Sequence, residues 1–151
     1  GVIFFGLMVT ARGVYLLEYN MRFGDPETQA VLPLLDSELL DAVQAALDRR
    51  LDASAFRWKD AHACCVVAAS KGYPGDYRTG LPIHHLEQAR FYAQVFIAGA
   101  KYSDGQYLTS GGRVLNLVGV AQTAAEARQK AYDAIARVQF DGITWRRDIG
   151  A

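Results

Sequence analysis

Three polar side chains at alternate positions of one segment carry the clearest chemical signal in this sequence. Glu18, Asn20 and Arg22 place a carboxylate, an amide and a guanidinium among apolar and aromatic neighbours. In a β-strand, side chains two positions apart lie on the same face, so Glu18 and Asn20 are expected about 6–7 Å apart along the strand. Two such oxygen donors suit Mg²⁺, which completes its coordination shell with water and phosphate. Arg22 adds a planar donor for phosphate or carboxylate.

The residues that follow favour a site over its alternative, the exposed polar face of a half-solvated strand. Gly24-Asp25-Pro26-Glu27 brings a sharp turn and two further carboxylates directly after the polar row. Proline suits the first position of a helix, so the pattern predicts a short helix to about Pro33 with Asp25 as its N-cap. The whole arrangement predicts a site for a metal–nucleotide complex next to a small polar substrate.

Hydrophobic periodicity predicts the elements that position these residues. Residues 2–9 and 14–19 are expected to form a β-hairpin, followed by a helix capped by Asp36-Ser37 that ends near Arg49-Arg50. Further on, the pattern predicts a strand over Ala61–Ser70 that is buried on both faces, followed by a loop over 71–82. A helix is expected from a Thr123–Glu126 capping box to about Val138. The remaining predicted strands are 95–102, 107–110, 113–121 and 143–146. This order indicates an α+β fold, with a small mixed or antiparallel sheet covered by helices on one face. The expected boundary lies in the polar stretch 48–60 and divides the chain into two domains, residues 1–57 and 58–151.

Composition excludes several classes of protein. The 151 residues contain sixteen basic and sixteen acidic side chains, so the clustered basic excess typical of nucleic-acid binding is absent. No apolar run reaches the ~18 residues of a membrane span. Cys64 and Cys65 are adjacent and are expected to stay reduced, which favours a cytoplasmic protein. The sequence begins within an apolar strand at Gly1, and we therefore expect a fragment whose upstream part is missing.

Residues 17–29, Leu-Glu-Tyr-Asn-Met-Arg-Phe-Gly-Asp-Pro-Glu-Thr-Gln, resemble the signature of the phosphoribosylamine–glycine ligases, also called glycinamide ribonucleotide synthetases. Further blocks of the sequence that resemble this family are 31–35, 70–77, 111–115 and 146–150. Departures from the family pattern are Tyr19, Met21, Ile97, Ala100 and Trp145, none of which removes a polar group from the signature. Ile97 stands where a histidine is frequent, which argues against a chemical role for that strand.

The resemblance implies the end of an ATP-grasp subdomain followed by the C-terminal domain of the ligase. It also implies a reaction in de novo purine biosynthesis: ATP converts glycine to glycyl phosphate, and the amino group of 5-phosphoribosylamine attacks it. The products are glycinamide ribonucleotide, ADP and phosphate. The implied cofactors are ATP and Mg²⁺ or Mn²⁺. The implied partners are these small substrates and the upstream domains of the same polypeptide.

The resemblance also implies roles for individual residues. Glu18 and Asn20 match metal-ligand positions, and Arg22 matches the signature and is expected to be a catalytic and substrate-binding residue that contacts the phosphoryl group. Asp25 and Glu27 match the signature and are expected to bind substrate, although Asp25 is equally explained as a helix cap. Arg113 is either a substrate-binding arginine or a surface arginine beside a β-bulge.

Several alternatives remain open. Lys71–Gly75 is expected to be a surface turn, with a lid over the site as the second interpretation. The pair His84-His85 lacks a further metal ligand at suitable spacing and is expected to be solvated. Another ATP-grasp carboxylate–amine ligase, or a non-catalytic fragment or binding module, also fits the sequence. We expect the chain by itself to be inactive.

Overall fold

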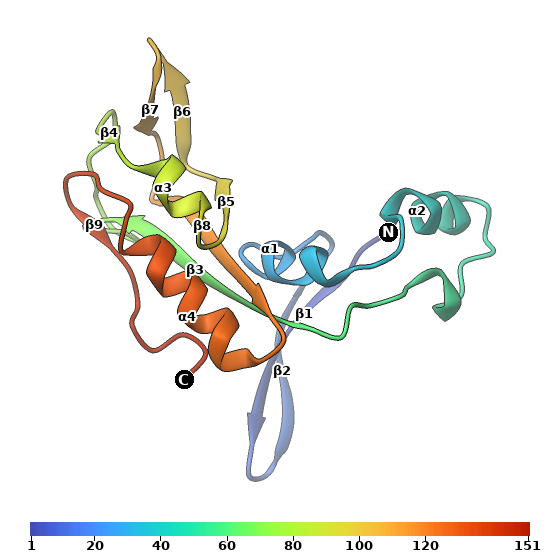
Figure 1. Cartoon of the computed structure of the whole chain (residues 1–151). Helices are drawn as coiled ribbons and strands as arrows, with labels where there is room; N and C mark the ends of the chain where they lie inside the picture. Colours follow the sequence, from blue (N-terminus) through green and yellow to red (C-terminus); the bar gives the residue numbers. More distant parts are fainter.

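The computed structural model describes residues 1–151 and has the α+β architecture expected from the sequence (Figure 1). The chain begins with a two-stranded antiparallel hairpin of β1 (Phe4–Thr10) and β2 (Gly13–Asn20), which projects away from the body. The register shifts between Gly6 and Leu7, so that Glu18 pairs with Gly6 and Leu16 with Leu7. Leu17 is thus the extra residue of a β-bulge just before the polar row.

The hairpin leads into a series of short helices. These are α1 (Glu27–Val31), the 3₁₀ turn η1 (Leu32–Leu34), α2 (Leu39–Leu47) and the 3₁₀ turn η2 (Ala53–Ala55). Figure 1 shows α2 and η2 lying away from the sheet, at the end of an extended connection.

Two predicted helix caps are wrong. Pro26, not Asp25, occupies the N-cap position of α1, and no side chain caps that helix. Asp25 accepts a hydrogen bond from the Gln29 side chain instead. For α2, Glu38 is the N-cap residue, because the Ser37 hydroxyl donates to the carbonyl of Ala55 at 2.9 Å. In both cases the side chain that was expected to cap the helix forms a hydrogen bond with another residue instead.

The main sheet has the strand order β5–β8–β3–β9 and is antiparallel throughout. Its strands are β3 (His62–Ser70), β5 (Gln94–Ile97), β8 (Arg113–Ala121) and β9 (Ile143–Thr144). Helices α3 (Leu86–Arg90) and α4 (Ala124–Ile135) cover one face of this sheet (Figure 1). The core lies between them and includes the fully buried residues Val66, Leu115, Leu117, Ala131 and Ile135. The Thr123 hydroxyl accepts from the backbone N–H of Glu126, as the predicted cap requires.

The prediction that β3 is buried on both faces is wrong. Cys64, Val66, Ala68 and Ser70 are buried, whereas the residues between them are only half-buried. Helix α4 packs closely along the strand, while α1 and η1 make a smaller contact with it. The continuous apolar run of β3 therefore belongs to a sheet that is fully covered on one face only.

A second sheet contains β4 (Pro82–Ile83), β7 (Gln106–Thr109) and β6 (Ala100–Ser103), in the order β4–β7–β6. The strand predicted over 95–102 is divided at Ala98-Gly99, so that β5 and β6 belong to different sheets. The backbone of Gly111 crosses Gly99 at this point: a Cβ on Gly99 would lie 2.8 Å from the Cα of Gly111. This tertiary contact explains the break.

The C-terminal residues are fastened to α4. Arg128 Nε donates to the carbonyl of Ile149 at 2.9 Å, and the Tyr132 hydroxyl donates to the carbonyl of Arg146 at 2.9 Å. The predicted strand 143–146 ends at Thr144, and Arg146 instead forms a local ion pair with Asp148. None of the helices is both long and apolar enough to cross a membrane.

Candidate functional site

The polar row at the end of β2 has the geometry that its alternation predicts. Asn20 Nδ2 donates to Glu18 Oε1 at 3.3 Å, and Arg22 Nη2 donates to Asn20 Oδ1 at 3.3 Å. A second bond runs from Arg22 Nη1 to the carbonyl of Phe23 at 2.9 Å. The prediction that Glu18 and Asn20 face the same side of one strand is confirmed.

The donor set of this row fits a hard divalent cation. A half-turn of the Asn20 amide exchanges its nitrogen and oxygen and turns the oxygen toward the Glu18 carboxylate. The 3.3 Å between the two side chains is close to the separation of about 3 Å between adjacent oxygen ligands of an octahedral Mg²⁺. No cluster of three or more His, Cys, Asp and Glu side chains suited to a metal occurs in the chain. A cation at Glu18 and Asn20 therefore needs oxygens from water and phosphate.

Asp25 lies at the centre of a second cluster. Its Oδ1 accepts from Gln29 Nε2 at 2.8 Å, and its Oδ2 accepts from Arg113 Nη2 at 2.9 Å. Asp25 precedes α1 and Arg113 begins β8, 88 residues later. The structure thus brings Arg113 to the signature segment. That Arg113 and Asp25 bind substrate stays a prediction.

Glu27 borders a pocket of about 300 Å³ between α1, β3, α4 and the C-terminal residues. Its carboxylate makes no hydrogen bond or ion pair within the chain and is exposed. Gly24 lies directly against it, because a Cβ there would approach Glu27 Oε2 to 2.5 Å. Glu27 is therefore an unpaired carboxylate beside the pocket that is open to a cationic ligand.

The thiol of Cys65 borders the same pocket. Burial is the largest cause that raises the pKa of Cys65 to about 12, and nearby Cys64, Asp25 and Glu27 contribute to the same rise in that order. Burial also raises the pKa of Cys64, while nearby Arg128 opposes the shift. Both residues are free thiols, as expected. Neither has the lowered pKa of a reactive cysteine.

Sequence reasoning missed the way in which residues 70–77 support Arg113. The Ser70 N–H donates to the carbonyl of Gly112 at 2.8 Å, and its hydroxyl donates to the carbonyl of Gly111 at 3.1 Å. The ring of Tyr73 lies so close to Gly112 that a Cβ there would be 2.1 Å from Tyr73 Cδ2. The resemblance of both blocks to one family was the available signal. Gln29 also belongs to the signature, but its sequence position alone does not reveal its partner.

The histidines gain no clear role. His84 and His85 have ring centroids 6.2 Å apart, and no third ligand is near them. His85 adopts the left-handed conformation, with φ of 64°, at the start of α3. His62 is exposed at the start of β3.

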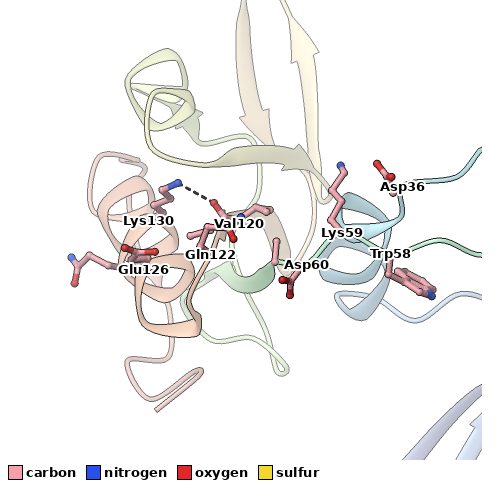
Figure 2. A pocket seen from close by; sticks show the side chains of 11 residues that line it. Asp36, Trp58, Lys59, Asp60, Val120, Gln122, Glu126 and Lys130 are labelled. Atoms are coloured by element: carbon pink, nitrogen blue, oxygen red, sulfur yellow. Dashed lines mark hydrogen bonds between the residues drawn. The ribbon is translucent and has the colours of Figure 1, made fainter.

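A second pocket, larger in volume than the one beside Glu27, lies away from the signature (Figure 2). It encloses about 960 Å³ between residues 58–61, the end of β8 and α4. Its two ammonium groups bind backbone carbonyls, Lys59 Nζ at Pro33 and Lys130 Nζ at Val120. None of the predicted site residues lines it, so volume alone does not make it the reaction site.

Comparison with known proteins supports the interpretation of the signature. Residues 63–151 match the sequence profile described as phosphoribosylglycinamide synthetase, C domain, and residues 1–28 match the ATP-grasp (A) domain of the same enzyme. A phosphoribosylamine–glycine ligase from Clostridium acetobutylicum is 54% identical over 99% of this chain, which covers 36% of that relative. A trifunctional purine biosynthetic protein, adenosine-3, from Gallus gallus is 43% identical over 99% of this chain and is covered to 15%.

A solved structure shows the same fold. The crystal structure of a phosphoribosylamine–glycine ligase from Thermotoga maritima superimposes with a TM-score of 0.82 at 37% identity, over 97% of this chain and 36% of that one. The C-domain profile alone spans residues 63–151, more than half of the sequence. The chain therefore belongs to the phosphoribosylglycinamide synthetase family.

Proposed function

We propose that this chain is the C-terminal part of an ATP-dependent ligase that joins glycine to 5-phosphoribosylamine. The observation that carries the proposal is the row Glu18, Asn20 and Arg22, whose side chains are hydrogen-bonded to one another in order at the end of β2 and just after it. The similarity to named phosphoribosylamine–glycine ligases supports it. The chain spans 36% of the length of these relatives, so the activity belongs to the whole polypeptide.

In this proposal, each signature residue has a task set by its charge and position. Glu18 and Asn20 supply two oxygens to Mg²⁺ or Mn²⁺. A divalent cation held by these two residues would supply positive charge that offsets the negative charge of the transferred phosphoryl group. Arg22 is held beside these ligands by its hydrogen bond to the Phe23 carbonyl, and there its guanidinium stabilises negative charge on phosphate oxygens.

The substrate contacts are assigned to the second cluster. The unpaired carboxylate of Glu27 suits the ammonium group of glycine, because opposite charges pair most favourably where other partners are absent. Arg113 offers a guanidinium to a phosphate or carboxylate group. The products are glycinamide ribonucleotide, ADP and phosphate, which places the reaction in de novo purine biosynthesis.

We further propose the division of the chain into residues 1–57, the end of the ATP-grasp domain, and 58–151, the C-terminal domain. The extended connection between α2 and β3 supports a boundary there. The remaining ATP-grasp elements and an N-terminal domain of the same polypeptide would supply the other walls of the site. We propose a cytoplasmic location, consistent with the free thiols of Cys64 and Cys65.

The test is ADP release by the full-length protein with ATP, Mg²⁺, glycine and freshly generated phosphoribosylamine. Release is expected only when both glycine and the amine are present, with glycinamide ribonucleotide identified by mass spectrometry. Replacing glycine by alanine or by formate is the control for substrate class. Equal release with another carboxylate or another amine would instead indicate a different ATP-grasp ligase.

A further inference from the structure

Both carboxylate oxygens of Asp25 already have partners inside the protein. Oδ1 accepts from Gln29 Nε2 at 2.8 Å and Oδ2 accepts from Arg113 Nη2 at 2.9 Å. The Asp25 side chain is 40% exposed and that of Arg113 is 41% exposed, so the pair lies at the surface of the cluster. A carboxylate engaged on both oxygens is poorly placed to bind a substrate ammonium group as well.

Arg113 is held at its backbone as well as at its side chain. Its carbonyl accepts from the Gly99 N–H at 2.7 Å. The preceding turn is bound by Ser70 through the carbonyls of Gly111 and Gly112. Close contacts of Gly99 with Gly111, and of the Tyr73 ring with Gly112, fill the space around that turn. The start of β8 therefore has little freedom to move.

The guanidinium of Arg113 keeps unused donors. An arginine side chain has five N–H groups, and within this chain only Nη2 makes a hydrogen bond, to Asp25. The single hydrogen bond to Asp25 restrains the guanidinium on one side and leaves its other N–H groups free. That is the arrangement of an arginine oriented in advance for a second anion.

We propose that Asp25 and Gln29 are positioning residues that orient Arg113 toward an anionic group of a substrate, a phosphate or a carboxylate. This inference deepens the proposed function and rests on it. Asp25 then acts on the reaction only through Arg113 and makes no substrate contact of its own. Gln29 acts one step further out, by fixing the other oxygen of Asp25.

The decisive experiment is a double-mutant cycle in the full-length protein. Asp25→Asn, Arg113→Lys and the double variant are compared by steady-state kinetics, with ATP, glycine and phosphoribosylamine varied in turn. Asp25→Asn is expected to raise KM for one of the three substrates about tenfold and to change kcat much less. Arg113→Lys is expected to raise the same KM, since lysine lacks the fixed planar fork. The affected substrate identifies whether the anion is a phosphate or a carboxylate.

The double variant distinguishes positioning from direct contact. If Asp25 acts through Arg113, the double variant is no worse than the more impaired single variant, because coupled residues are not additive. Multiplicative loss would show that Asp25 touches the substrate itself and would overturn the inference. Unchanged kinetics in Arg113→Lys would overturn it too. Gln29→Met provides a second variant should Asp25→Asn fail to fold, and a smaller rise of the same KM is expected.

The chain supplies a matched control pair. Arg78 Nη2 and Asp141 Oδ2 also lie 2.9 Å apart, but both side chains are more than 70% exposed and lie outside the cluster. Asp141→Asn is expected to leave all three KM values unchanged. A wild-type protein without glycine-dependent ADP release would remove the proposed function and the inference together. An active wild type with an additive cycle removes the inference alone.

Discussion

The metal-binding carboxylate of the proposed site contributes little to folding. Glu18 accepts a single long hydrogen bond, from Asn20 at 3.3 Å; Glu18 is exposed and Asn20 is partly buried. An exposed polar contact of this kind contributes about 0–1 kcal/mol to stability. Effects of Glu18 variants on activity can therefore be separated from effects on folding.

We predict that Glu18→Gln in the full-length protein lowers kcat for glycine-dependent ADP release about 100-fold or more. The reason is that loss of a metal ligand removes several kcal/mol of charge stabilisation. The thermal unfolding midpoint should stay within a few degrees of wild type. Glu38→Gln, at an exposed carboxylate that bonds to nothing, is the matched control. Normal turnover of Glu18→Gln at saturating Mg²⁺ would contradict the metal assignment.

Cys65 gives a prediction for alkaline pH. Burial raises its thiol pKa to about 12 from an ordinary value of 9.0, so the folded protein holds this proton more tightly than the unfolded chain does. The unfolded chain loses the proton first, and stability falls as pH rises from about 9 to 12. The free energy of unfolding of wild type minus that of Cys65→Ala should therefore decrease over this range. Urea unfolding at several pH values measures it, and a constant difference would contradict the pKa shift.

Among the elements, the contact between α4 and β8 depends on the absence of a side chain. A Cβ at Gly119 would lie 2.0 Å from the carbonyl oxygen of Ala127 and 2.8 Å from the N–H nitrogen of Ala131. Both are backbone atoms of a helix and cannot turn aside. The close approach explains how a helix with small residues on its buried face can pack directly on the strand.

We predict that Gly119→Ala lowers the free energy of unfolding by about 3 kcal/mol, because the helix must move away from the sheet. Gly6→Ala is the control, since a Cβ there would lie 3.2 Å from the flexible Glu18 Cγ and no closer than 3.4 Å to any backbone atom. Urea unfolding of both variants measures the difference. Equal stability of the two variants would show that α4 can shift without cost.

Elements with local signals were predictable, and those that depend on distant contacts were not. The hairpin, β8 and the Thr123 cap follow from alternation, turn residues and capping preference, which act over a few residues. The caps of α1 and α2 were wrong because Gln29 and Ala55 take the side chains that would serve them. The row from Glu18 to Arg22 was predictable for the same local reason. The pairing of Asp25 with Arg113 was not, because no local pattern specifies a contact across 88 residues.

Over the whole molecule, many of the exposed apolar side chains lie in parts of the chain that stand away from the core. Val9 and Leu40 are 75% and 73% exposed, on the hairpin and on α2. Figure 1 shows both elements projecting from the main sheet. Exposed apolar strands and helix faces of this kind favour association with other protein surfaces.

We predict that the isolated 151-residue chain self-associates at micromolar concentrations and lacks glycine-dependent ADP release. Val9→Lys should reduce the association, because a charge on an exposed strand opposes pairing. Phe91→Lys, at an exposed aromatic residue far along the chain from the hairpin, should not. Sedimentation velocity over a range of concentrations measures both. A chain that stays monomeric throughout would contradict the prediction.

The ion pair between Asp25 and Arg113 also bears on how such enzymes can be recombined. One partner lies in the segment that matches the ATP-grasp profile and the other in the segment that matches the C-domain profile. A hybrid gene joined within residues 48–60 would inherit the two partners from different parents. Hybrids should keep the parental KM values where both parents carry this acid and this arginine, and show a raised KM for one substrate where either residue differs. Residues 48–60 look like the most suitable place to join modules from two enzymes. The Asp25–Arg113 ion pair forms between the segments on either side of this connection, so both segments must come from parents that carry the matching residues.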